Sequence, residues 1–149
     1  MVMTVWAVAM HAAPTLARDH FQCSIESQAA QAIIDLRDRG QPKSFVLAPL
    51  PPRETVFNSK RGTLQAKLAV QMHSIIEDVY ADPDIKLGAY LAYRNASCII
   101  RNAGKKVPMT FSEVALPIHG CQEKFGALPS AGLTQCVGEV FDYYQASDH

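Results

Sequence analysis

Apolar residues recur three and four positions apart in several long stretches of this chain, which is the spacing of one face of an α-helix. The first stretch predicts a helix over residues 19–38, in which the Asp19 carboxylate accepts from the free backbone N–H groups of the first turn. Gly40 ends this helix and Pro42 prevents its resumption. Two neighbouring stripes make its apolar arc broad, which indicates a central helix; they contain Phe21, Cys23, Ile25, Ala29, Ala30, Ile33, Ile34 and Leu36.

Two further long helices are predicted, and they meet at a sharp corner. Residues 64–80 form the second helix, capped by Thr63, with an apolar face made of Leu64, Leu68, Met72, Ile75, Ile76 and Val79. Asp82 and Pro83 predict the start of the third, because aspartate favours the N-cap and proline the first turn. This helix is expected to run to about Asn102, before Gly104.

The C-terminal third predicts shorter helices. Thr110 begins a capping-box spacing, and the short helix after it is expected to bend or end near Pro117. Another short turn is expected over residues 120–125, and Ser130 caps a last helix over residues 131–145. No stretch of useful length alternates apolar and polar residues as a strand would. The prediction is therefore an all-α fold, a small bundle of about four main helices.

Residues 41–62, between the first and second main helices, differ from the rest. They are apolar but rich in proline, which lacks the backbone N–H and disfavours helix before it; the prolines are Pro42, Pro49, Pro51 and Pro52. One short turn is expected around residues 44–47. The remainder is predicted to be a long Pro-rich loop, in a fold where most connections have two to eight residues.

The N-terminus of this 149-residue chain resembles a secretion signal. Residues 2–13 are mostly apolar, and small residues precede a cleavage point at Ala17. No Lys or Arg stands before the apolar run, as in a signal truncated at its start. The alternative is an apolar helix end that packs on the domain. We expect residues 1–17 to be the signal and residues 18–149 a single helical domain, with no membrane span, because no apolar run reaches about 20 residues.

The chain has four cysteines, and an even count in an exported chain favours two disulfides. We expect Cys23 to pair with Cys98, because both lie on apolar stripes of long helices. Cys121 and Cys136 are close in sequence and flank a turn, so we expect the second disulfide between them. Four buried thiols in a cytosolic protein are the first alternative. A zinc site is the second, and it fits badly because no two cysteines lie two to four residues apart.

Charge and motifs exclude several function classes. Fourteen basic residues balance fourteen acidic ones, so no long-range field attracts nucleic acid, and none is predicted as a partner. His73 and Glu77 can share a helix face, which favours an intrahelical contact rather than a site. His119 lies near Cys121, but a Cys–His dyad would need an unpaired thiolate. No catalytic residue, metal ligand or cofactor is predicted.

The overall plan is an export signal, a helical domain, four cysteines and one long loop. This plan resembles that of the exported immunity proteins of bacterial type VI secretion amidase effectors. The resemblance covers the whole chain and rests on the plan, not on a motif, so it transfers no residue. It implies a periplasmic or secreted protein that binds and blocks a toxin, with a secreted amidase as its partner.

Three functions compete at this point. The first is a non-enzymatic binding or inhibitor protein, whose partner would meet the Pro-rich loop; the residues expected to make contact are Phe45, Leu47, Leu50, Arg53 and Phe57. The alternative for this loop is a strap that covers the core. The second function is a small-molecule or lipid carrier with a pocket between helices, and the third is an enzyme of unfamiliar type. The sequence does not indicate an oligomeric state.

Overall fold

The computed structural model describes residues 13–57 and 63–147, and the side chains of this part from His20 onward except that of Phe57. Within these ranges there is no strand, and the all-α prediction is confirmed. The helices are α1 (Ala13–Asp38), α2 (Lys43–Leu47), α3 (Arg53–Phe57), α4 (Leu64–Ala81), α5 (Leu87–Asn102), a 3₁₀ turn η1 (Phe111–Glu113), α6 (Ala115–Phe125) and α7 (Ala131–Ala146).

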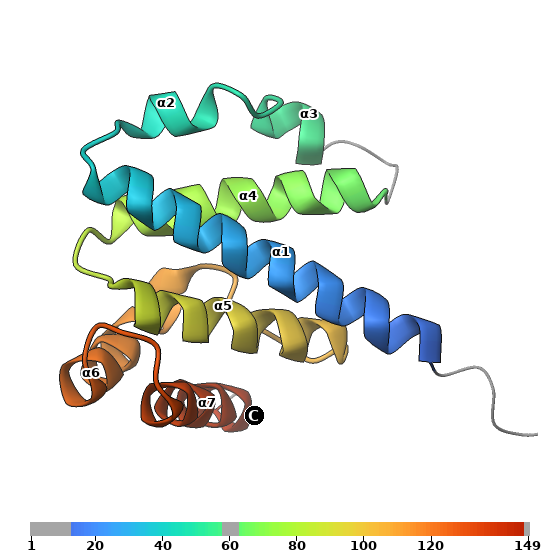
Figure 1. Cartoon of the computed structure of the whole chain (residues 1–149). Coiled ribbons are helices and arrows are strands. Elements are labelled where there is room, and N and C mark those ends of the chain that lie inside the picture. The colour runs from blue at the N-terminus through green and yellow to red at the C-terminus, as the bar shows by residue number, and fades with distance from the viewer. Residues whose placement is uncertain (1–12, 58–62, 148–149) are drawn as a thin grey trace, which may run out of the picture.

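The helices are arranged in three levels around α1 (Figure 1). Helix α1 crosses both α4 and α5 and packs on each of them. Helices α2 and α3 lie along the outer side of α4, while α6 and α7 lie beyond α5. The prediction that the first helix is central is therefore confirmed. Its broad apolar arc is explained by its two neighbours, since a helix between two others must bury a wide face.

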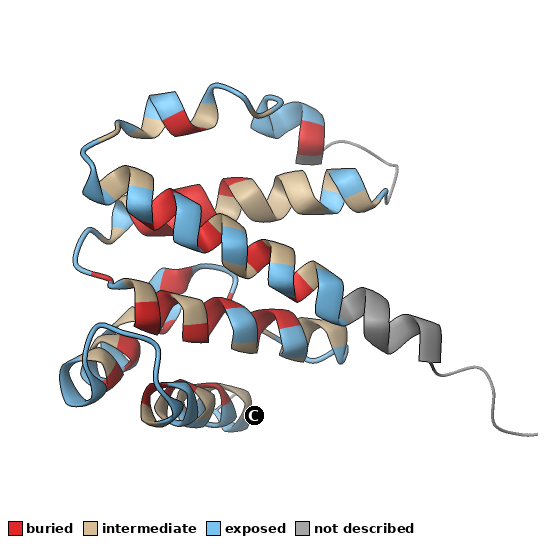
Figure 2. Ribbon diagram, viewed as in Figure 1, coloured by how far each residue is buried: buried red, intermediate tan, exposed pale blue. Residues whose placement is uncertain are grey.

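The core extends to both sides of α5 and also takes residues from α1, α4, α6 and α7 (Figure 2). Isoleucines from α1 and α4 fill one half of it, and all of these are at most 2% exposed: Ile33, Ile34, Ile75 and Ile76. Aromatic rings fill the other half. The ring of Tyr93 lies 4.9 Å from that of Phe111 and 5.8 Å from that of Phe141, centroid to centroid. Such edge-to-face and stacked pairs add to the stabilisation from area burial.

Several helix ends lie where their local capping signals predict them. Thr63 accepts a hydrogen bond from the N–H of Ala66, and Ser130 accepts one from the N–H of Leu133, both at 3.2 Å. Thr110 forms the predicted capping box with Glu113. Gly104 follows α5 with a φ of 72°, a left-handed conformation that glycine adopts without strain.

The corner between α4 and α5 differs from the prediction. Asp82 ends α4, and α5 begins only at Leu87, so Asp82 and Pro83 do not start a helix. The Asp82 carboxylate instead accepts from the N–H of Ile85 at 3.1 Å, which holds a tight turn. The guanidinium of Arg37 donates to three backbone carbonyls here, those of Val79, Asp82 and Ile85. These bonds satisfy carbonyls that a continuous helix would have paired internally.

Three other boundaries are also corrected. Helix α1 begins at Ala13, so Asp19 lies inside it and is not its cap. Helix α6 runs unbroken through Pro117, which stands in the first turn, where its missing N–H would have had no partner. In the Pro-rich segment, α2 matches the expected turn, but α3 was not predicted. Residues 1–12 of the predicted signal lie outside the described part of the chain, and cleavage after Ala17 remains a prediction.

Both predicted disulfides are confirmed. Cys23 is bonded to Cys98, which joins α1 to α5, and Cys121 is bonded to Cys136, which joins α6 to α7. All four cysteines of the chain are thus paired. The buried-thiol and zinc alternatives do not apply to this structure.

Candidate partner-binding site

Residues 41–57, which we call the strap, are fixed against the outer side of α4. Two of the strap's own residues, Val46 and Val56, are buried, with 8% and 7% of their surface exposed. The hydroxyl of Tyr80 donates to the carbonyl of Gln41 at 2.7 Å. Buried apolar contacts and polar bonds from both ends of the segment therefore hold the strap in one position.

Two more contacts with the strap come from His73 and Glu77, which the sequence predicts to contact each other. The ring Nε2–H of His73 donates to the carbonyl of Pro51 at 2.9 Å, and the carboxylate of Glu77 forms an ion pair with Lys43. The predicted intrahelical contact between His73 and Glu77 is therefore replaced by two separate contacts with the strap. Both side chains act in holding residues 41–57 on α4.

The five predicted contact residues fall into two groups. Phe45 is 58% exposed and Arg53 is also exposed, so both side chains lie at the surface. Leu47 and Leu50 are partly buried and pack against the core. The side chain of Phe57 lies outside the described residues. The strap thus covers the core with one side and presents Phe45 and Arg53 on the other.

Beside Arg53 lies a partly open pocket of about 470 Å³, a volume typical of ligand sites. Its walls are α4, α5 and residues 107–110, and Arg53 of α3 stands at its edge. The polar lining residues are Arg53, Gln71, Ser74, Glu77, Asp78, Tyr93, Arg94, Ser97, Arg101 and Thr110, and the apolar ones are Val70, Val107, Pro108 and Met109. Met109 is 88% exposed, which places an apolar side chain at the rim.

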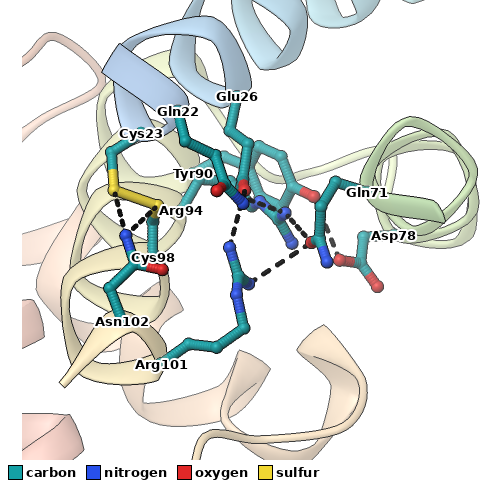
Figure 3. A network of polar contacts seen from close by, with 10 residues as sticks. All are labelled: Gln22, Cys23, Glu26, Gln71, Asp78, Tyr90, Arg94, Cys98, Arg101 and Asn102. Carbon is teal, nitrogen blue, oxygen red and sulfur yellow. Dashed lines mark hydrogen bonds and ion pairs between the residues drawn. A yellow bond between two sulfur atoms is a disulfide. The ribbon is translucent and has the colours of Figure 1, made fainter. Parts of the chain in front are cut away.

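A polar network includes three of the residues that line this pocket, Gln71, Arg94 and Arg101 (Figure 3). Glu26 of α1, only 1% exposed, accepts from Arg94 at 3.0 Å and from Arg101 at 2.6 Å. The amide oxygen of Gln71 accepts from the same two guanidiniums, at 2.8 and 3.3 Å. One carboxylate and one neutral oxygen therefore face two positive charges. This network links α1, α4 and α5 next to the Cys23–Cys98 disulfide.

Sequence reasoning missed this network, although a signal for it exists. Glu26 stands on the apolar stripe of α1, three residues after Cys23 and four before Ala30. Arg94 stands likewise between Tyr90 and Cys98 on the apolar side of α5. A charged residue is rarely buried without a partner. Two opposite charges on two apolar stripes that a disulfide brings together could have predicted the pair.

A second buried carboxylate, that of Asp78, also lines the pocket. It accepts from the hydroxyl of Tyr90 at 3.0 Å and from the N–H of Phe111 at 3.2 Å. Burial raises the pKa of Asp78 above its ordinary value, although both hydrogen bonds and the charge of Arg94 act to lower it. Burial also raises the pKa of Tyr93 to about 12. Shifted pKa values in one pocket are typical of functional sites.

A Cys–His dyad of Cys121 and His119 does not form in this structure. Cys121 is oxidised, so it cannot supply the thiolate of such a dyad. His119 is hydrogen-bonded to the carboxylate of Asp82 at 2.7 Å instead. Among the described residues there is no group of three side chains that could hold a metal ion. No helix in the described part of the chain is long and apolar enough to cross a membrane.

Comparison with protein-family models, with curated proteins and with solved structures finds no match to this chain. The strap, the pocket and the charges around them are therefore the features that indicate a function.

Proposed function

We propose that the protein is exported and acts without catalysis by binding another protein, as the inhibitor or immunity partner of a secreted toxin that degrades the cell wall. The observation that carries the proposal is the way the strap is held. Buried valines and contacts from His73, Glu77 and Tyr80 fix it on α4, while Phe45 and Arg53 remain exposed. A surface fixed before binding loses little conformational entropy when it docks, which favours affinity.

Two further observations support individual parts of this proposal. Two disulfides in one small domain are typical of proteins that work outside the reducing cytosol, which supports export to the periplasm or beyond. The proposal that the protein inhibits a toxin is supported by the resemblance of its overall plan to that of immunity proteins. Phe45 and Arg53 belong to the residue types that dominate binding energy at protein interfaces, because aromatic rings bury large areas and guanidiniums bind carboxylates through paired donors.

For the carrier alternative, a lipid is a less well supported ligand than a polar molecule. Three arginines and two acidic residues line the pocket beside the strap, and a lipid tail would have to remove these charges from water. The polar lining favours a ligand that brings hydrogen-bonding or charged groups of its own.

The proposal is tested by affinity capture from a periplasmic extract of the native host, with the full chain as bait. Phe45→Ser and Arg53→Ser should each weaken capture of one protein by about tenfold or more, the loss expected at an interface centre. Both side chains are exposed, so the melting temperature should stay close to that of the wild type. The captured protein is then purified, and its cell-wall hydrolysis is measured with and without the wild-type chain.

Two control variants make the result specific. Tyr143 on α7 is 77% exposed, and Tyr143→Ser removes an exposed aromatic ring from another surface, so capture should not change. Leu50→Ser acts on a residue that packs against the core and should lower the melting temperature. Equal capture by the wild type and both strap variants would contradict the proposed surface. A captured protein whose activity the chain leaves unchanged would contradict inhibition.

A further inference from the structure

A second pocket, of about 430 Å³, adjoins the first one. The two pockets share Val70, Gln71 and Arg101 as lining residues, so they form one groove. The α4 residues that line the groove recur at intervals of three and four positions, with two adjacent pairs among them, and thus lie on a single face: Lys67, Val70, Gln71, Ser74, Glu77 and Asp78. The α5 residues do the same: Tyr93, Arg94, Ser97, Arg101 and Asn102.

The length of the groove suits an extended peptide segment better than a single small molecule. Lys67 and Asp78 are eleven positions apart on α4, which at 1.5 Å per residue corresponds to about 16 Å. An extended chain covers that distance with about five residues at 3.3 Å each. The two pockets are therefore placed to receive neighbouring side chains of one segment.

The charges in the groove are unevenly distributed. The second pocket is lined by two cations, Lys67 and Arg101, and by no carboxylate. At the opposite end, Glu77 is already paired with Lys43, and Asp78 already accepts two hydrogen bonds. The acidic groups of that end thus have partners within the chain. The Lys67 end of the groove is basic.

Gln71 occupies the position between the two arginines where an anion would bind more strongly. Its neutral amide oxygen accepts from Arg94 and Arg101 together, and among the described residues Glu26 supplies the one carboxylate that these two guanidiniums contact. Two positive charges and one negative charge leave a formal charge of +1 in this cluster. A carboxylate is a stronger acceptor for guanidinium than an amide is, since the bond is then charge-assisted.

We propose that this groove binds an extended acidic segment of the partner protein, with carboxylate side chains at the end formed by Lys67, Gln71 and Arg101. This inference rests on the proposed function, because it names the chemistry that the partner presents. Arg53, on the strap, also lines the first pocket. The segment would therefore meet the strap, whose exposed surface carries Phe45.

The test is a binding titration with a labelled acidic peptide of about six residues, long enough to span the groove. Fluorescence anisotropy at about 50 mM salt, where screening is weak, compares a peptide with two adjacent glutamates against its glutamine twin. The acidic peptide should bind at least about fivefold more tightly. Lys67→Gln should remove about fivefold in affinity, while Lys124→Gln, the same charge change on an exposed residue of α6, should leave it unchanged.

Arg101→Lys provides a second variant that keeps the charge. Arg101→Lys retains attraction to the peptide but removes the forked donor pair that contacts Glu26 and Gln71, so binding should weaken. The double variant Lys67→Gln, Arg101→Lys should bind more weakly than Arg101→Lys alone. Equal affinity for both peptides, or no effect of Lys67→Gln, would overturn the proposal. Full displacement of the acidic peptide by an equal concentration of free glutamate or inorganic phosphate would also overturn it, because it would indicate a site for small anions.

Capture of the natural partner separates this inference from the proposed function. If Lys67→Gln captures the partner as well as the wild type does, the groove is not part of the interface, while the strap variants still decide the proposed function. If the acidic peptide binds the groove but no inhibited partner is captured, the proposed function fails and the preference of the groove for acidic segments stands.

Discussion

At the scale of single residues, the protein holds two buried carboxylates in different ways. Glu26 meets the guanidiniums of Arg94 and Arg101, so its charge is balanced by ionic partners. Asp78 meets the hydroxyl of Tyr90 and a backbone N–H, both neutral donors. When a carboxylate is buried, hydrogen bonds from neutral donors compensate less of the lost hydration free energy than bonds from a guanidinium do. Burial accordingly raises the pKa of Asp78, although its hydrogen bonds from Tyr90 and Phe111 act to lower it.

The raised pKa of Asp78 predicts how stability changes with pH. Between the ordinary carboxyl pKa of 3.8 and the raised one, the folded protein binds a proton that the unfolded chain has lost. The contribution of this group to the free energy of unfolding therefore decreases as pH rises through the raised pKa. Asp78→Asn should remove that part of the pH dependence. Denaturant unfolding over a series of pH values measures it.

Asp35→Asn is the matched control, because Asp35 is an exposed aspartate on α1. Its substitution should leave the shape of the pH profile close to that of the wild type. If Asp78→Asn and Asp35→Asn gave the same profile, the assignment of the pH dependence to Asp78 would be wrong.

At the scale of elements, the sequence predicts those helix ends that local chemistry determines. Thr63 and Ser130 were identified as caps because their hydroxyls can accept N–H groups three residues later, and they do so. The start of α5 depends instead on a distant segment. The N–H of Gly88 donates to the carbonyl of Ala127 at 2.9 Å, and Lys86 makes no side-chain cap. Such contacts between remote residues cannot be derived from local spacing.

Gly88 offers a direct test of this close approach. A Cβ at this position would lie 2.5 Å from the backbone carbon of Leu128 and 2.8 Å from the carbonyl oxygen of Ala127. Gly88→Ala should therefore destabilise the protein by about 1–3 kcal/mol, although alanine favours helix. Gly138→Ala in α7 is the control, since a Cβ there meets nothing within 4 Å and should stabilise by about 1 kcal/mol. Denaturant unfolding of both variants measures the difference, and stabilisation by both would refute the close contact.

At the scale of the whole molecule, the fold class and the disulfide pairing could be predicted, but the site only in part. Helical periodicity and the cysteine count depend on residue types and spacing alone. The position of Arg53 at the edge of a groove depends on how α3 lies on α4, and the Glu26 network depends on how α1 crosses α5. The sequence indicates Arg53 as a contact residue from the chemistry of its side chain alone. The structure adds that this side chain lines a pocket of the groove.

The two disulfides should differ in what they contribute to the stability of the whole chain. Cys23 and Cys98 are 75 positions apart, and Cys121 and Cys136 are 15 apart. If a disulfide acts by restricting the unfolded chain, the longer loop contributes about 4.5 kcal/mol and the shorter one about 3 kcal/mol. The double variant Cys23→Ser, Cys98→Ser should therefore lose more stability than Cys121→Ser, Cys136→Ser in guanidinium unfolding. The reverse order would show that packing of the new serine hydroxyls, and not loop length, controls the loss of stability.

The same variants also give a prediction for binding. Because Cys23–Cys98 joins α1 to α5 beside Glu26, its removal should weaken binding of the acidic peptide, whereas removal of Cys121–Cys136 should not.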